Sequence, residues 1–324
     1  MPGVVGRRKP RWEPLKEFGA AGVLRPVGRS PHRVRAACRW AGLLPAVGIL
    51  GRGWALRLLS LMGARDEVGG WRMEYWTPGS ALVVAAHPDD IEFGCAGTVA
   101  RWVQEGALVT YALVTNGAAG SSDPDMTRER LAELREAEAR ASAKVVGVDQ
   151  VEFLGYEDGL LEPTLEVREQ IVRLIRRVRP EVVVTTDPTT RYFGDRYINH
   201  PDHRAAGEAT LAAVIPGSDT RLAYPELVEE GLEPVKLTGV WVMMNTEPNL
   251  VVDIGDFIDK KIESLACHVT QLSDPGEDFG FVRSMAEFSA TDQPFRYGEA
   301  FRVFRFDLPW EPPRADPEAP LSEA

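Results

Sequence analysis

The chain has 324 residues, of which 44% are hydrophobic and 26% charged, and its formal net charge is −11. This composition excludes wholesale disorder and fibrous repeats, and it is typical of a water-soluble protein with one or two domains and a large core. Three scattered cysteines, Cys38, Cys95 and Cys267, are too few for a disulfide framework, so we expect a reducing, cytoplasmic compartment.

Charge divides the chain at about residue 72. Residues 1–72 carry 14 Lys/Arg and 4 Asp/Glu, a net charge of +10. Residues 73–324 carry 23 Lys/Arg and 44 Asp/Glu, a net charge of −21. Nucleic-acid affinity depends mainly on clustered Lys and Arg, so the acidic remainder argues against a nucleic-acid partner.

The first 72 residues have no helical or alternating apolar period. Their apolar run 40–50 contains Pro45 and is shorter than the roughly 18 uninterrupted residues of a membrane span, so a membrane partner is not expected. We expect a disordered extension or a misassigned start before Met73, with a surface-binding or targeting segment as the alternatives. Residues 73–310 are then the folded domain, and the Pro-rich residues 311–324 a disordered tail.

From Met73 onward, short apolar segments alternate with amphipathic ones. The segments with the length and composition of strands are 81–86, 108–115, 151–154, 181–185 and 237–245. Helices are predicted at 94–106, 127–146, 165–178, 204–213 and 256–269. This alternation requires crossover connections and predicts an α/β fold with a mainly parallel sheet covered on both faces.

Ligands of such sheets bind at the carboxyl ends of the strands, so the loops after residues 86, 115 and 185 should converge. The first loop reads Ala86-His-Pro-Asp-Asp-Ile-Glu92. The adjacent carboxylates of Asp89 and Asp90 repel each other unless a cation or hydrogen bonds neutralise them, so a divalent metal is a natural ligand. For this loop alone, helix capping by the aspartates is the structural alternative.

A second His/Asp cluster, His200-Pro-Asp-His203, precedes the predicted helix 204–213. A catalytic zinc takes three protein ligands from His, Asp or Glu and keeps one position for water, and His87, Asp90 and His203 would supply such a set. Asp89 is then the nearest carboxylate that could act as general base.

We expect His200, oriented by Asp202, to serve the transition state. The loop after the first strand lacks the G-x-G-x-x-G pattern, and its acidic groups would repel a pyrophosphate, which argues against a dinucleotide site.

These motifs resemble those of the PIG-L/LmbE-like family of zinc-dependent N-acetylglucosaminide deacetylases. Residues 86–90 resemble the first family motif, 200–203 the second, and 262–272 the C-terminal helix signature, in the same order. The resemblance covers residues 81–306 and implies the LmbE-like fold, a Rossmann-like three-layer sandwich with a mainly parallel sheet. It also implies zinc as the cofactor, and Fe²⁺ or Co²⁺ would suit the same ligands.

Three further residues are candidates for substrate binding. Arg135 resembles a family arginine that contacts the sugar, although an arginine on an amphipathic helix is otherwise solvated. Asn116 ends a predicted strand, where an Asn-Gly turn is the alternative. His268 would enter the sugar pocket from the last helix, unless it is a core histidine.

The sequence thus predicts a metal-dependent hydrolase that removes acetyl from a small N-acetyl amino sugar. The alternatives are an amidase acting on another amide, such as a thiol conjugate, and a sugar-binding module without turnover. We expect loops 117–127, 187–199 and 216–236 to determine the substrate specificity. A homo-oligomer is possible, although the apolar residues 240–243 suit a core strand better than an interface.

Overall fold

The computed structural model describes residues 73–195, 197–272 and 279–308. The predictions made for residues 1–72 and 311–324 lie outside this part of the chain. Within it, no helix combines the length and the apolar character needed to cross a membrane.

The described residues form a seven-stranded sheet with the strand order β3-β2-β1-β4-β7-β9-β8. Its parallel strands are β1 (Ser80–Ala85), β2 (Leu108–Thr115), β3 (Gln150–Tyr156), β4 (Val182–Thr186) and β7 (Gly239–Met243). β9 (Gly298–Arg305) is antiparallel to both β7 and β8 (Leu250–Asp253). The connections after β1 and β4 leave in opposite directions along the sheet, which creates the switch point where α/β sheets bind ligands.

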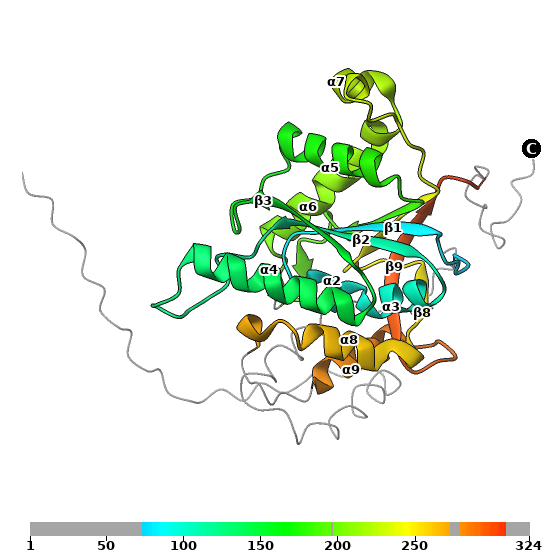
Figure 1. Cartoon of the computed structure of the whole chain (residues 1–324). Helices are drawn as coiled ribbons and strands as arrows, with labels where there is room; N and C mark the ends of the chain where they lie inside the picture. Colours follow the sequence, from blue (N-terminus) through cyan, green and yellow to red (C-terminus); the bar gives the residue numbers. More distant parts are fainter. Residues whose placement is uncertain (1–72, 196, 273–278, 309–324) are drawn as a thin grey trace, which may run out of the picture. The chain divides into compact units, whose positions relative to one another are not determined.

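Helices cover both faces of the sheet (Figure 1). One face packs against α2 (Asp90–Gly94), α3 (Ala96–Gln104), α4 (Arg128–Val145), α8 (Ile258–Leu265) and α9 (Gly280–Ser289). The other packs against α5 (Leu165–Val178) and α6 (Pro201–Ala212). Successive β1 side chains enter opposite cores, Val83 the first and Val84 the second, because strand side chains alternate between faces. The predicted three-layer α/β sandwich is confirmed.

Several elements differ from the sequence prediction. The expected helix 94–106 corresponds to α3, and the short helix α2 before it was not predicted; Cys95, whose φ of −151° is not helical, separates the two. β8, α9 and β9 were not predicted, because their patterns are short or mixed and their partners lie far away in sequence. A small hairpin, β5 (Tyr192–Phe193) with β6 (Tyr197–Ile198), interrupts the connection from β4 to α6.

The connection from α6 to β7 lies at the amino end of the sheet. It contains η2 (Ala213–Ser218), η3 (Arg221–Ala223) and α7 (Pro225–Glu229). The buried Arg176 side chain donates to the Gly217, Thr220, Tyr224 and Leu232 carbonyls and so organises this segment. Since α6 begins at the carboxyl edge and runs away from it, the expectation that loop 216–236 borders the substrate is wrong.

The remaining elements are the short helical turns η4 (Gly255–Phe257) and η5 (Val269–Gln271). The β7 residues 240–243 are at most 3% exposed. They therefore belong to the core, as their composition predicted.

Candidate active site

The loop after β1 places its polar residues at the carboxyl edge of the sheet. Asp89 has a φ of +100°, in the left-handed region, and this turn starts α2 at Asp90. The backbone N–H of His87 donates to Asp90 Oδ2 over 2.9 Å. Both side chains are almost fully buried, so they contribute to an enclosed polar centre and are not solvated groups.

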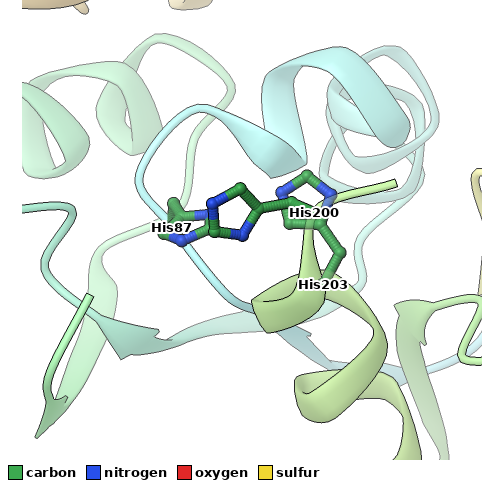
Figure 2. Close-up of side chains that lie close together, drawn as sticks. All are labelled: His87, His200 and His203. Atoms are coloured by element: carbon green, nitrogen blue, oxygen red, sulfur yellow. The ribbon is translucent and has the colours of Figure 1, made fainter. Parts of the chain in front are cut away.

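The second loop approaches from the other side of the switch point. Figure 2 shows the rings of His87, His200 and His203 gathered together. The centroids of the His87 and His200 rings lie 4.7 Å apart. His203 Nδ1 lies 3.1 Å from Asn199 Oδ1, and Asn199 in turn donates to the Thr190 carbonyl. Because Nδ1 of His203 is held by this amide, its Nε2 faces the centre.

Asp90 lies between the two predicted histidine ligands. Its Oδ1 is 2.9 Å from His203 Nε2, and its Oδ2 is 3.6 Å from His87 Nδ1. The three predicted metal ligands, from two loops about 110 residues apart, therefore meet. Two imidazoles and a carboxylate are a donor set that suits zinc or a similar transition metal.

Within the described part of the chain, two groups of three side chains bring one ligand atom each within 4.8 Å of one another, and neither contains Asp90. They are His87, His200 and His203, and His87, Asp158 and Asp202. His87 belongs to both groups. The side chains that could hold a metal ion thus gather around His87, in more than one combination.

Asp158 was not singled out by sequence reasoning. It follows β3 in a Glu-Asp-Gly turn, and its Oδ1 lies 3.0 Å from His87 Nε2. Its other oxygen accepts the Ala119 N–H over 2.7 Å. The only signal in the sequence was its place directly after a strand of the predicted sheet. A carboxylate on the second nitrogen of a metal-binding histidine is a common way to orient the imidazole.

The Asp202 side chain makes its shorter contacts away from His200. It accepts from the Gly159 N–H over 2.7 Å and lies 3.3 Å from His87 Nε2, whereas its nearest approach to His200 Nδ1 is 3.9 Å. His200 Nδ1 instead accepts the backbone N–H of Asp202 over 3.2 Å. His200 is therefore oriented by this backbone bond, which assigns its proton to Nε2 when the ring is neutral.

The carboxylates around His87 control its charge. Burial lowers the pKa of His87, but Asp158, Asp202 and Asp90 outweigh burial and raise it well above its ordinary value. Burial raises the pKa of Asp158, yet its bond to His87 and the Ala119 N–H brings it down to about 2. In the absence of a metal, a cationic His87 thus balances this acidic cluster, and a metal ion would take over that charge.

Asp89 has a different environment from Asp90. Burial, opposed by Arg135, raises the pKa of Asp89 to about 6. Burial also acts to raise the pKa of Asp90, but His203 and His87 bring it well below its usual range. Asp90 is therefore kept as an anion beside the histidines, whereas Asp89 can exchange a proton near neutral pH.

The predicted substrate contact Arg135 is 4% exposed. Its Nη2 lies 3.2 Å from Asp89 Oδ2, and its guanidinium donates to the carbonyls of Pro88 and Gly117. Gly117, with a φ of +68°, lets the arginine pass, because a Cβ atom at this position would overlap the guanidinium. These contacts indicate that Arg135 holds the Asp89 loop in place.

The other two predicted substrate contacts differ in exposure. Asn116 is half-buried after β2, and its side chain makes no hydrogen bond to the described residues. His268 is fully buried, with its Nε2 3.2 Å from Glu92 Oε2, close enough for an ion pair but not aligned as a hydrogen bond. His268 is therefore a buried partner of Glu92 in α2, and it also acts to lower the pKa of Asp89.

His200 is the most open of the three histidines, with 38% of its side chain exposed. Burial and the neighbouring His87 and His203 lower its pKa. A neutral imidazole with its proton on Nε2 is therefore the favoured form of His200.

Comparison with known proteins places this geometry in context. A family model described as PIG-L, GlcNAc-PI de-N-acetylase, matches residues 82–214, which include both His/Asp loops. Diacetylchitobiose deacetylase of Thermococcus kodakarensis is 32% identical over 223 residues, 68% of this chain and 81% of the relative. A probable N-acetyl-alpha-D-glucosaminyl L-malate deacetylase 2 of Bacillus anthracis is 28% identical over 197 residues, which are 59% of this chain and 81% of the relative.

Among solved structures, the N,N'-diacetylchitobiose deacetylase of Pyrococcus horikoshii in complex with its inhibitor MPG has a TM-score of 0.66 and 29% identity. The match covers 70% of this chain and 84% of that chain.

Proposed function

We infer that this chain, which belongs to the PIG-L family of GlcNAc-PI de-N-acetylases, is a hydrolase that removes acetyl from an N-acetylglucosamine-type substrate. The observation that carries this inference is the meeting of His87, Asp90 and His203 beside Asp89 at the switch point of the sheet. A metal site and a carboxylate of raised pKa are what amide hydrolysis by activated water requires.

We assign His87, Asp90 and His203 as the metal ligands. Asp90 approaches both histidines and its pKa is held low by them, as befits an anionic ligand. His200 fits less well than these three, because it is more exposed and its Nδ1 already accepts a backbone N–H. When bound, a divalent metal such as Zn²⁺ would polarise the acetyl oxygen and lower the pKa of a water molecule towards about 7.

The protein side chains would then divide the proton transfers. Asp89 is the proposed general base, since its pKa of about 6 lets it accept a proton from water and pass it to the leaving amine. Arg135 keeps this carboxylate in position. The Nε2–H of His200 would donate a hydrogen bond to the oxyanion of the tetrahedral intermediate, a contribution of several kcal/mol in comparable sites.

The substrate would enter at the carboxyl edge, bordered by loops 117–127 and 187–199. Asn116 supports this placement, because its amide has donors and an acceptor left for a ligand. The relatives named above act on N-acetylglucosamine joined to a second sugar or to malate, so the amino sugar is the shared element. We propose that the two loops recognise the group attached to it.

The test is acetate release by Zn²⁺-loaded protein from diacetylchitobiose and from N-acetylglucosaminyl malate. Asp89→Asn should lower kcat by roughly 10²- to 10⁴-fold, since it removes the base but keeps the shape of the side chain. Its bound zinc, measured by atomic absorption, should stay near one equivalent. Full-rate release by this variant would refute the assignment of the base, and no release by the parent protein from any N-acetylglucosaminide would refute the function.

A further inference from the structure

A buried ion pair lies next to the site and takes no part in the mechanism above. Lys261 of α8 is 3% exposed and Glu299 of β9 is 4% exposed, and Lys261 Nζ lies 2.6 Å from Glu299 Oε1. Removing two such ions from water costs several kcal/mol for each, and a neutral apolar pair is often as stable or more so. Stability alone is therefore a poor explanation for this pair.

The hydrogen bonds of the pair converge on the break between α2 and α3. Glu299 accepts from the N–H groups of Gly97 and Thr98, in the first turn of α3, over 3.0 and 2.7 Å. Lys261 Nζ donates to the carbonyl of Phe93, near the end of α2, over 3.0 Å. The pair thus satisfies backbone groups that each helix leaves free at the break.

Side chains of neighbouring elements pack closely against the break between α2 and α3. A Cβ atom at Gly94 would overlap the side chain of Met243, and one at Gly97 would lie 2.9 Å from Ile254. The Lys261–Glu299 pair holds the remaining side through directed bonds. The packing and the ion pair together determine the angle between α2 and α3.

The direction of α2 matters because this helix carries Asp90 at its first position. It has only five residues and spans about 7.5 Å, so a shift at Phe93 reaches Asp90 with almost no intervening chain. Asp90 in turn faces His203 and His87 over the distances given above. A displacement of about 1 Å in a catalytic geometry can cost roughly 10²-fold in rate.

We propose that Lys261, held in place by Glu299, is a positioning residue that orients α2, and with it Asp90 and Asp89, for the reaction. This proposal rests on the proposed deacetylase function. Lys261 acts through the carbonyl of Phe93, while Glu299 pairs with the charge of Lys261, and a glutamine in its place can still accept a bond from the first turn of α3. Neither side chain touches the substrate or the metal.

The test compares two variants of the full chain. Lys261→Met combined with Glu299→Gln removes both charges and the bond to Phe93, so it should keep the stability of the parent while kcat falls roughly 10- to 100-fold. Glu299→Gln alone leaves a buried, unpaired lysine that still reaches Phe93. It should be less stable than the double variant and yet more active, within about threefold of the parent kcat.

This opposite ranking of stability and activity separates positioning from a merely structural role, in which the two would fall together. Two readouts are added: KM, expected within about twofold of the parent in both variants, and the visible absorption of the Co²⁺-loaded protein, expected to change in the double variant only. Arg176→Met is the control, because Arg176 is an equally buried cation at the other edge of the sheet. It should lose stability and keep both kcat and the Co²⁺ spectrum.

A double variant with the kcat and Co²⁺ spectrum of the parent would overturn the proposal, as would a Glu299→Gln variant that is as inactive as the double one. If the double variant does not fold, Lys261→Leu with Glu299→Met supplies a second neutral pair for the same comparison. The Co²⁺ spectrum needs no substrate. A parent protein that releases no acetate would therefore refute the proposed function without deciding the role of the pair.

Discussion

Asp158→Asn tests whether the carboxylate missed by the sequence analysis supports the metal centre. In the structure, Asp158 is 5% exposed and uses both oxygens: Oδ1 lies 3.0 Å from His87 Nε2, and Oδ2 accepts the Ala119 N–H. An asparagine has the same shape but only one acceptor oxygen. Either His87 or Ala119 must therefore lose its partner.

The size of the effect follows from these contacts. Loss of an outer-shell carboxylate typically lowers metal affinity by about 10- to 100-fold. Asp202 Oδ2 remains 3.3 Å from the same His87 nitrogen and can hold part of the interaction. We therefore expect about a tenfold loss of Zn²⁺ affinity, which corresponds to about 1.4 kcal/mol. The broken bond at a buried site should also lower the free energy of unfolding by about 1 to 3 kcal/mol.

The assay is competition for Zn²⁺ against a chromophoric chelator at fixed pH. Asp149→Asn is the matched control, because Asp149 is an exposed aspartate just before the same strand, β3, at the opposite edge of the sheet. It should bind zinc as the parent protein does. A folded Asp158→Asn variant that binds zinc within twofold of the parent would refute the argument that this carboxylate orients His87.

Other predictions follow from neighbouring contacts. Arg135→Lys should lower kcat about 10-fold or more with KM nearly unchanged if Arg135 positions Asp89, whereas a raised KM at constant kcat would indicate direct substrate binding. Gly117→Ala should destabilise the protein more than Gly106→Ala, as measured by thermal unfolding; both have positive φ, but only at Gly117 would a Cβ meet the Arg135 side chain. Chelation of the metal should lower the melting temperature, since a ligand at 100 times its Kd adds about 2.7 kcal/mol. His203→Ala should lack most of this shift, and an equal shift in both proteins would contradict its assignment as a ligand.

The sequence was most informative where a pattern is local. The spans of β2 and α5 were predicted to the residue, because buried strands and amphipathic helices have their own periodicities and end signals. The His/Asp motifs were recognisable for the same reason, since each is a short run of neighbouring residues at the start of a helix. Family membership followed from these motifs and is confirmed by the comparisons.

Only the tertiary structure decided which side chains complete the site. It brought Asp158 to His87, turned Arg135 towards Asp89, and buried His268 beside Glu92. It also placed loop 216–236 at the amino edge of the sheet, away from the His/Asp loops. These outcomes depend on contacts between residues distant in the chain, and on the direction in which each side chain leaves its helix or loop. Composition and spacing carry little of that information, because local patterns determine the elements while the packing between them determines which polar groups meet.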